Sequence, residues 1–307
     1  MSSPTGPEPG LPVRMPRPRQ PGRHRRPEPV VAPENAAALV LAVPGTPSSA
    51  IRSLAEEVIS IARSELPGLD ARIGYLDSED AEYPTLEAAL VNAAAERTER
   101  YELAKAAGRD VAAPEGPSAV AVPLLAGPDS GIMRRIRQAV MDSGTPAELT
   151  DVLGPHPLLA EALHVRLSEA GLSRADRARL FTVATAADGI ILGTVGGEEA
   201  MQAAGITGML LAARLAVPVM AAALDQEGSV AAIAEQLRGS GSVQLALAPY
   251  LIGPELVDGL LDTAVKEADC SASEPIGAYP AIGKLVLSKY ATALGITPQQ
   301  PQGSPAF

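Results

Sequence analysis

Apolar and polar residues alternate in blocks along the chain, and these blocks predict strands followed by helices. Short, continuous apolar runs are typical of buried parallel strands, and they occur at residues 38–43, 71–76, 118–125, 189–194, 217–222 and 242–248. Apolar residues spaced three and four apart predict helices at 48–66, 85–107, 132–141, 157–170, 230–237, 254–266 and 281–294, with one more ending at 215. Strand and helix alternating with short connections predict an α/β fold, in which helices flank parallel sheets.

One stretch of sequence occurs twice. Residues 123–129 (PLLAGPD) are followed by residues 153–157 (LGPHP) and an apolar helix, and residues 249–255 (PYLIGPE) are followed by residues 276–280 (IGAYP) and another apolar helix. Residues 41–46 and 192–197 echo each other in the same way. Such a repeat indicates one supersecondary plan used twice. We therefore expect two tandem, repeat-related domains at 36–172 and 173–296, each with a parallel sheet, and a cleft between them.

The two ends of the chain have a different composition. Residues 1–35 are rich in proline, arginine and glycine, and neither they nor residues 297–307 show a periodic apolar pattern. Both segments are predicted to be disordered tails. The arginines of the first tail have two open interpretations, a docking arm for a protein partner or a solvated, dispensable extension.

Composition and charge narrow the range of partners and compartments. The formal net charge is -11 despite the basic first tail, so the folded body is acidic and nucleic acid is not expected to bind it. The most apolar stretch, 206–224, is interrupted by Arg214 and Pro218, which argues against a membrane span. Cys270 is the single cysteine, and the N-terminus lacks a signal-peptide pattern. A cytoplasmic protein is the expectation.

Glycine-containing turns follow four of the predicted strands. Gly45 with Thr46, Gly127, Gly196 and Gly253 each stand close to a strand end, where parallel sheets bind their ligands. Glycine lets the backbone approach a ligand, so these turns are candidate ligand-binding positions; the alternative is that they are structural turns. The chain lacks a phosphate-binding loop and a dinucleotide fingerprint, which argues against a nucleotide ligand.

The order of these segments resembles a known family. Residues 43–46 (VPGT), 123–129, 153–163 and 277–281 are similar, in sequence order, to segments of the class II chelatases, in the long two-domain form of the sirohydrochlorin cobalt- or iron-chelatases. The resemblance covers about residues 37–295. It implies a chelatase-like fold and a lyase that inserts a divalent metal into a tetrapyrrole in sirohaem or cobalamin biosynthesis. Co²⁺ or Fe²⁺ would be a substrate, the tetrapyrrole a small-molecule partner, and no tightly bound cofactor is expected.

The positions of the implied catalytic imidazoles hold other residues. By the resemblance they fall on Pro44 and Asp129, with Val195 and Glu255 at the mirrored positions. Proline offers no side-chain ligand, and aspartate is a harder and weaker base than imidazole. Asp129 therefore remains the candidate catalytic group, and Asp129 with Glu255 the candidate metal ligands. The alternative is that each carboxylate complements the start of a predicted helix.

The three histidines do not supply the missing imidazoles. His24 lies in the first tail, His156 precedes a predicted helix, and His164 lies on that helix as a surface or interface residue. Two functions from different classes therefore stay open. One is a chelatase-like enzyme of tetrapyrrole metabolism, with its activity undecided. The other is a non-catalytic protein that binds a tetrapyrrole, a metal or a protein partner on the same fold.

Overall fold

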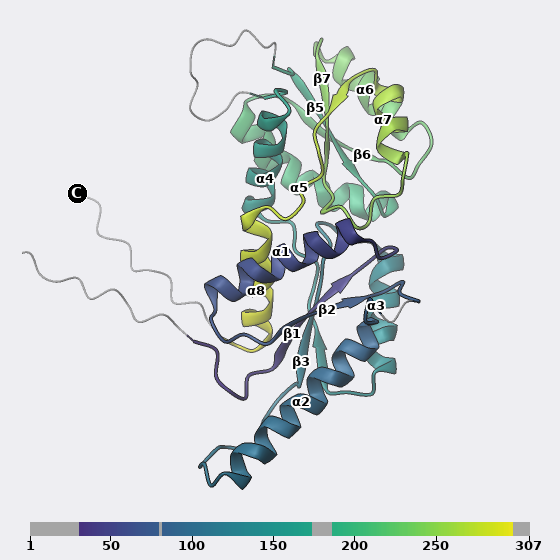
Figure 1. The fold of residues 1–307 in the computed structure, drawn as a ribbon. Coiled ribbons are helices and arrows are strands. Elements are labelled where there is room, and N and C mark those ends of the chain that lie inside the picture. The colour runs from purple at the N-terminus through teal and green to yellow at the C-terminus, as the bar shows by residue number, and fades with distance from the viewer. Residues whose placement is uncertain (1–30, 80–81, 174–185, 297–307) are drawn as a thin grey trace, which may run out of the picture.

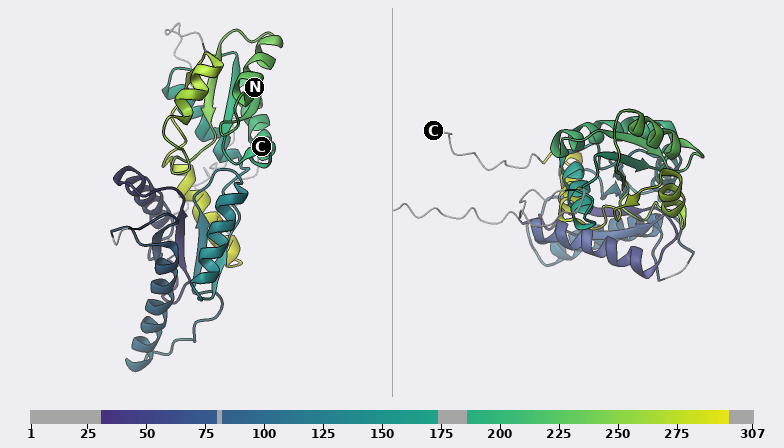
Figure 2. Two further views of the ribbon diagram at one scale, coloured as in Figure 1. Left: turned by 90° about the vertical axis from the view of Figure 1, so that its right-hand side faces the viewer. Right: turned by 90° about the horizontal axis from the view of Figure 1, so that it is seen from above.

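The computed structural model describes residues 31–79, 82–173 and 186–296. Most of the predicted first tail and all of the predicted last tail lie outside these residues. The described residues form two four-stranded sheets, each flanked by helices. The two halves of the molecule are stacked end to end (Figures 1 and 2).

The first sheet contains β1 (Ala38–Val43), β2 (Ala71–Tyr75), β3 (Ala119–Pro123) and β4 (Ala147–Leu149). All its strands are parallel, in the order β2-β1-β3-β4. Its connecting helices are α1 (Ser49–Glu65), α2 (Leu86–Ala106) and α3 (Ser130–Asp142). Ser48 and Thr85 cap α1 and α2, as expected for hydroxyl side chains just before a helix.

The second sheet repeats this plan. It contains β5 (Gly189–Thr194), β6 (Val219–Ala223), β7 (Leu245–Pro249) and β8 (Ser271–Ala272), again all parallel, in the order β6-β5-β7-β8. Its connecting helices are α5 (Gly197–Leu215), α6 (Ser229–Gly239) and α7 (Leu260–Ala268). The identical strand order confirms the predicted α/β fold of two repeat-related parallel sheets.

The last helix of each half packs on the other half. α4 (Pro157–Glu169) follows the first sheet in sequence but packs against α5 and β7, whereas α8 (Pro280–Ala293) packs against α1 and β3 (Figure 1). The Tyr290 hydroxyl on α8 donates to the carbonyl of Ala37 at 2.6 Å. Arg166 on α4 donates to the carbonyl of Ile276 at 3.0 Å. The two halves are therefore completed by an exchange of helices.

The hydrophobic core reflects this exchange. One cluster runs through both halves on the side of α1, α8, α4 and α5, and joins residues as far apart as Leu39 and Leu192. The opposite faces have separate clusters, one under α2 and α3 and one under α6 and α7. The apolar face shared by the two halves holds them together.

Some boundaries differ from those expected from sequence. β4 and β8 have three and two residues, too few to produce a recognisable apolar pattern. The helix predicted at 254–266 begins only at Leu260, because residues 254–259 form turns that end with Gly259 at φ +77°. The charged residues at 254–259 are therefore outside the helix.

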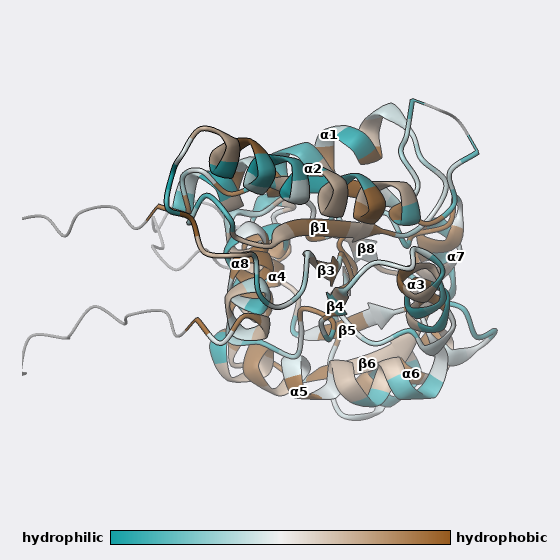
Figure 3. Cartoon of the chain, turned by 90° about the horizontal axis from the view of Figure 1, so that it is seen from below, coloured by the Kyte–Doolittle hydropathy of each residue, from teal (hydrophilic) through white to brown (hydrophobic). Residues whose placement is uncertain are grey.

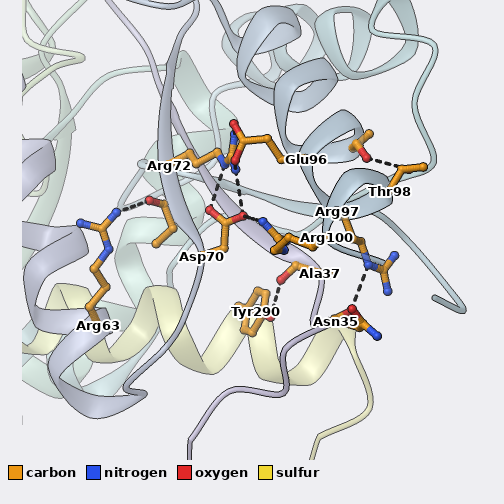
Figure 4. A network of polar contacts seen from close by, with 12 residues as sticks. Asn35, Ala37, Arg63, Asp70, Arg72, Glu96, Arg97, Thr98, Arg100 and Tyr290 are labelled. Atoms are coloured by element: carbon orange, nitrogen blue, oxygen red, sulfur yellow. Dashed lines mark hydrogen bonds and ion pairs between the residues drawn. The ribbon is translucent and has the colours of Figure 1, made fainter. Parts of the chain in front are cut away.

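A polar network lies at the amino ends of the first sheet's strands (Figure 4). The Asp70 carboxylate, just before β2, accepts hydrogen bonds from Arg72 at 2.9 Å and Arg100 at 3.2 Å, and Arg72 also pairs with Glu96. Burial alone would raise the pKa of Asp70, but the hydrogen bonds and charges of the two arginines lower it. Arg97 donates to the carbonyl of Asn35 nearby. This network is at the end of the strands opposite to the candidate site.

Candidate functional site

The carboxyl ends of the two sheets face each other, and their turns meet in two equivalent pairs. Gly45, at φ +80°, lies so close to the next half that a Cβ on it would stand 2.3 Å from the carbonyl oxygen of Pro254. Gly196, at φ +111°, makes the equivalent approach: a Cβ on it would stand 2.9 Å from the carbonyl oxygen of Pro128. The turn after β1 therefore touches the turn after β7, and the turn after β5 touches the turn after β3. Glycine is needed here for close backbone approach.

Asp129 is the N-cap of α3. Its carboxylate accepts a hydrogen bond from the Ile132 N–H at 2.8 Å. This arrangement satisfies a backbone donor that has no partner within the helix, and places negative charge at the positive end of the helix dipole. The helix-start interpretation of Asp129 is confirmed, and one carboxylate oxygen is already engaged by the backbone.

Glu255 has a different structural role from the one expected. Its side chain is buried, and its two oxygens accept from the N–H groups of Ile252 at 2.6 Å and Gly253 at 3.0 Å. Since α7 begins at Leu260, the helix-start interpretation of Glu255 was wrong; the carboxylate closes its own turn instead. Burial raises the pKa of Glu255; the backbone hydrogen bonds oppose this, and the nearby charge of Asp129 adds to it.

The structure brings the two candidate carboxylates to one cavity. Asp129 and Glu255 line it together with Gly127, Thr194 and Tyr250, and its volume is about 10 Å³. A space of that size holds roughly one water molecule. Within residues 31–79, 82–173 and 186–296, no group of three or more His, Cys, Asp and Glu side chains is arranged to hold a metal ion. The cavity is therefore too small for a macrocycle between these carboxylates.

Tyr250 joins the two halves at this cavity, although it was not among the residues predicted to be functional. Its hydroxyl donates to the carbonyl of Ala126 in the first half at 3.0 Å and accepts from Thr207 at 3.2 Å. Burial raises the pKa of Tyr250 to about 12. One feature of the sequence could have indicated Tyr250. The two repeats differ at this position, where the first copy has Leu124.

The remaining candidate residues that the structure describes are buried or half-buried, or they cap a helix. Pro44 is buried at the end of β1, and Val195 is half-buried after β5. His156 caps α4, with its Nδ1 accepting the Leu158 N–H at 3.1 Å, as the sequence indicated. His164 is buried between α4 and α5, where its Nδ1 accepts from Arg214 at 2.9 Å, so it is an interface residue rather than a surface residue. His24 lies outside the described residues.

An open hollow adjoins the first glycine turn. It has a volume of about 940 Å³, and its lining includes Thr46 after β1, Asp77 and Glu79 after β2, and Tyr83. The guanidinium of Arg52 stands 4.5 Å from the centre of the Tyr83 ring, and Arg135 of α3 pairs with Asp77. The hollow therefore has an aromatic ring and two arginines in contact with its lining, at the carboxyl ends of two strands.

Comparison with known proteins supports the fold. No protein-family model matches the chain, and neither does any curated protein sequence. Among solved structures, the chain is similar to the sirohydrochlorin chelatase SirB from Bacillus subtilis subspecies spizizenii in complex with cobalt, with a TM-score of 0.55. The match covers 85% of this chain and 97% of that chain at 13% identity. The fold is chelatase-like.

Two other solved structures are matched at lower TM-scores. A periplasmic ribose ABC transporter from Conexibacter woesei gives a TM-score of 0.31 at 12% identity, covering 86% of this chain and 88% of that chain. An extracellular ligand-binding receptor from Verminephrobacter eiseniae gives 0.29 at 8% identity, covering 76% and 62%. Among the described helices, none combines the length and apolar character needed to cross a bilayer.

Proposed function

We propose that this chain is a tetrapyrrole-binding protein of sirohaem or cobalamin metabolism in the cytoplasm, and that it does not itself catalyse metal insertion. One observation carries the second part: Pro44 and Asp129 stand where the chelatase resemblance implies imidazoles. Asp129 caps α3, and its mirrored counterpart Glu255 closes a buried turn. Neither carboxylate is placed to accept pyrrole protons from a macrocycle.

The hollow beside Thr46 is the proposed binding site. Its volume of about 940 Å³ falls within the size range of small-molecule pockets. The Arg52 guanidinium covers one side of the Tyr83 ring and pairs with Glu82, and Arg135 pairs with Asp77. Carboxylate substituents of the macrocycle would compete with these acidic partners for the two guanidinium groups. If Co²⁺ or Fe²⁺ reaches this site, it would be as the metal already inserted in the bound macrocycle. No resident cofactor is proposed.

Binding and insertion are measured separately. Under anaerobic conditions, titration of the full chain with sirohydrochlorin should change the macrocycle's absorbance spectrum with a saturable dependence on protein concentration. Arg135→Ala should weaken this binding several-fold, because it removes a guanidinium at the hollow. Arg137→Ala is the matched control, since this exposed arginine is on the same helix. If Arg135→Ala binds sirohydrochlorin as tightly as the wild type does, the hollow is not the binding site.

Insertion is tested by adding Co²⁺ or Fe²⁺ to the bound macrocycle and following the absorbance of the metallated product. We expect the wild-type chain to give the uncatalysed rate. A rate that rises in proportion to protein concentration would overturn the non-inserting part of the proposal. Asp129→Asn would then show whether that carboxylate carries the reaction.

A scaffold or interaction protein is the second candidate function. It is favoured by exposed apolar residues on α5, which include Ile206 at 48% and Met209 at 67% of their surface. Absence of sirohydrochlorin binding, together with loss of a protein partner on deletion of residues 1–35, would select this function and assign a role to the arginine-rich segment.

A further inference from the structure

The outer side of α5 has a cluster of large apolar side chains. Ile206, Met209 and Leu210 expose 48%, 67% and 38% of their surface. Residues three and four positions apart lie on the same face of a helix, so the three form one continuous patch. α5 lies at the outside of the molecule, with apolar residues along it (Figure 3). Single exposed apolar residues are ordinary on protein surfaces, whereas a contiguous patch indicates an interaction site.

The repeat provides an internal control for this patch. The buried residues of α1 are Ala55, Val58, Ile59 and Ala62, and those of α5 include Ala204, Thr207, Gly208 and Leu211 in the same spacing. In this alignment α1 has Glu57 where α5 has Ile206, and Ser60 where α5 has Met209. Both α1 residues are exposed. Leu210 aligns with Ile61, which is also apolar. The fold therefore does not require apolar side chains at positions 206 and 209, and these two are particular to the second half.

We propose that the α5 patch binds the same patch on a second copy of this chain, with the two helices antiparallel about a two-fold axis. Such an interface is self-complementary, so Ile206 of each copy packs against Met209 of the other. Gly205 beside the patch has no atom within 4 Å of the position its Cβ would take, so the second helix can approach closely.

The charges of α5 favour the antiparallel arrangement. Glu198 and Glu199 lie in its first turn, and Arg214, whose Nε also donates to His164, lies in its last turn. With Ile206 opposite Met209, the acidic start of each helix comes within about one turn of the basic end of the other. The two helix dipoles also oppose each other favourably. A parallel pair would instead bring like charges together at both ends.

The size of the patch predicts a weak dimer. Three large side chains on each copy form a smaller surface than the roughly 1,200–2,000 Å² of a standard stable interface. We therefore expect association on the order of micromolar concentrations rather than an obligate dimer. This proposal rests on the α5 patch and not on ligand binding, so it can fail without affecting the proposed binding of a tetrapyrrole.

Sedimentation velocity of the full chain over a series of concentrations tests the proposal. The average mass should rise from 31.5 kDa toward twice that value as concentration increases. The variant Ile206→Glu/Met209→Ser carries the side-chain types of α1 and should remain at 31.5 kDa throughout, with an unchanged circular-dichroism spectrum. Leu103→Ser is the matched control, because Leu103 on α2 is 61% exposed and away from α5; it should dimerise like the wild type.

Cross-linking tests the helix pairing directly. In a Cys270→Ser background, a mixture of Ile206→Cys and Met209→Cys chains should form an intermolecular disulfide on mild oxidation. Val243→Cys, at a position 80% exposed on the second half, should not cross-link. A wild-type chain that stays monomeric at every concentration overturns the proposal. A dimer that persists in Ile206→Glu/Met209→Ser overturns it as well.

Discussion

Glu255 places a buried carboxyl group beside the Asp129 carboxylate at the junction of the two halves. Glu255 accepts two backbone N–H groups, Asp129 caps α3, and Tyr250 bonds to the backbone of the opposite half. Each of these three side chains thus has a backbone partner. At the scale of single residues, these side chains stabilise the turns and the contact between the two halves.

Glu255 should give the protein a specific pH dependence. Because burial raises its folded-state pKa, the folded state holds the Glu255 proton more tightly than the unfolded state does. The stabilisation is fully present below the usual glutamate pKa and is lost as pH rises through the folded-state pKa. The free energy of unfolding of the wild type minus that of Glu255→Gln should therefore fall over this range. Urea unfolding at a series of pH values measures it, and a difference that rises with pH contradicts the assignment.

Tyr250→Phe should destabilise the protein by about 0.5–1.5 kcal/mol, because it removes the hydroxyl donor from the buried carbonyl of Ala126, which still accepts from the Gly154 N–H at 3.0 Å. Chemical unfolding of the two proteins measures the change. Tyr101→Phe on α2 is a control with the same chemical substitution, expected to stay within about 0.5 kcal/mol of the wild type. Equal effects of the two variants would show that the Tyr250 hydroxyl does not join the halves.

At the scale of turns and helices, the exchange of α4 and α8 and the paired glycine turns determine how the halves fit. The backbone of the turn after β1 touches that of the turn after β7. The turn after β5 touches the turn after β3 in the same way. These contacts repeat about a pseudo-two-fold relation, since the halves share one strand order. The contacts between glycine turns are therefore duplicated, as the sheets are.

Gly45→Ala should lower the free energy of unfolding by more than the penalty for placing an alanine at a positive φ. The added Cβ would lie 2.3 Å from the carbonyl oxygen of Pro254, so the facing turns must separate. Gly116→Ala is the matched control, because Gly116 has φ +71° and no atom within 4 Å of its Cβ position. We expect Gly45→Ala to lower the free energy of unfolding by at least about 1 kcal/mol more than the control. Equal losses would mean that the turns are not in contact in solution.

Gly283→Ala tests the packing of α8 on α1. A Cβ at this position would lie 2.5 Å from the Ile61 side chain, so overpacking should cost about 1–3 kcal/mol. Gly205→Ala within α5 meets no atom within 4 Å and should stabilise by about 0.5–1 kcal/mol, as usual for alanine inside a helix. Thermal unfolding at low protein concentration should show opposite signs. The same sign for both would contradict close α1–α8 packing.

At the scale of the whole molecule, the sequence predicted the architecture and most elements but not how the parts meet. The continuous apolar runs at 38–43 and 189–194 coincide with β1 and β5, since buried parallel strands have few polar positions. The exchange of α4 and α8 was beyond prediction, because an apolar helix face does not indicate which sheet it covers. The same limit applied to Glu255, whose carboxylate turns back to its own loop.

The helix exchange also determines when the first sheet can complete its folding during synthesis. α8 is the last of the described helices, yet it packs on α1 and β3, which belong to the first half of the chain. During synthesis, one face of the first sheet therefore waits for residues 280–293 to leave the ribosome. Contacts between residues so distant in sequence form slowly, and until then that apolar face is open to misassembly. The first repeat unit expressed alone would lack α8, and the second would lack α4, so each would be without the helix that covers its sheet in the full chain.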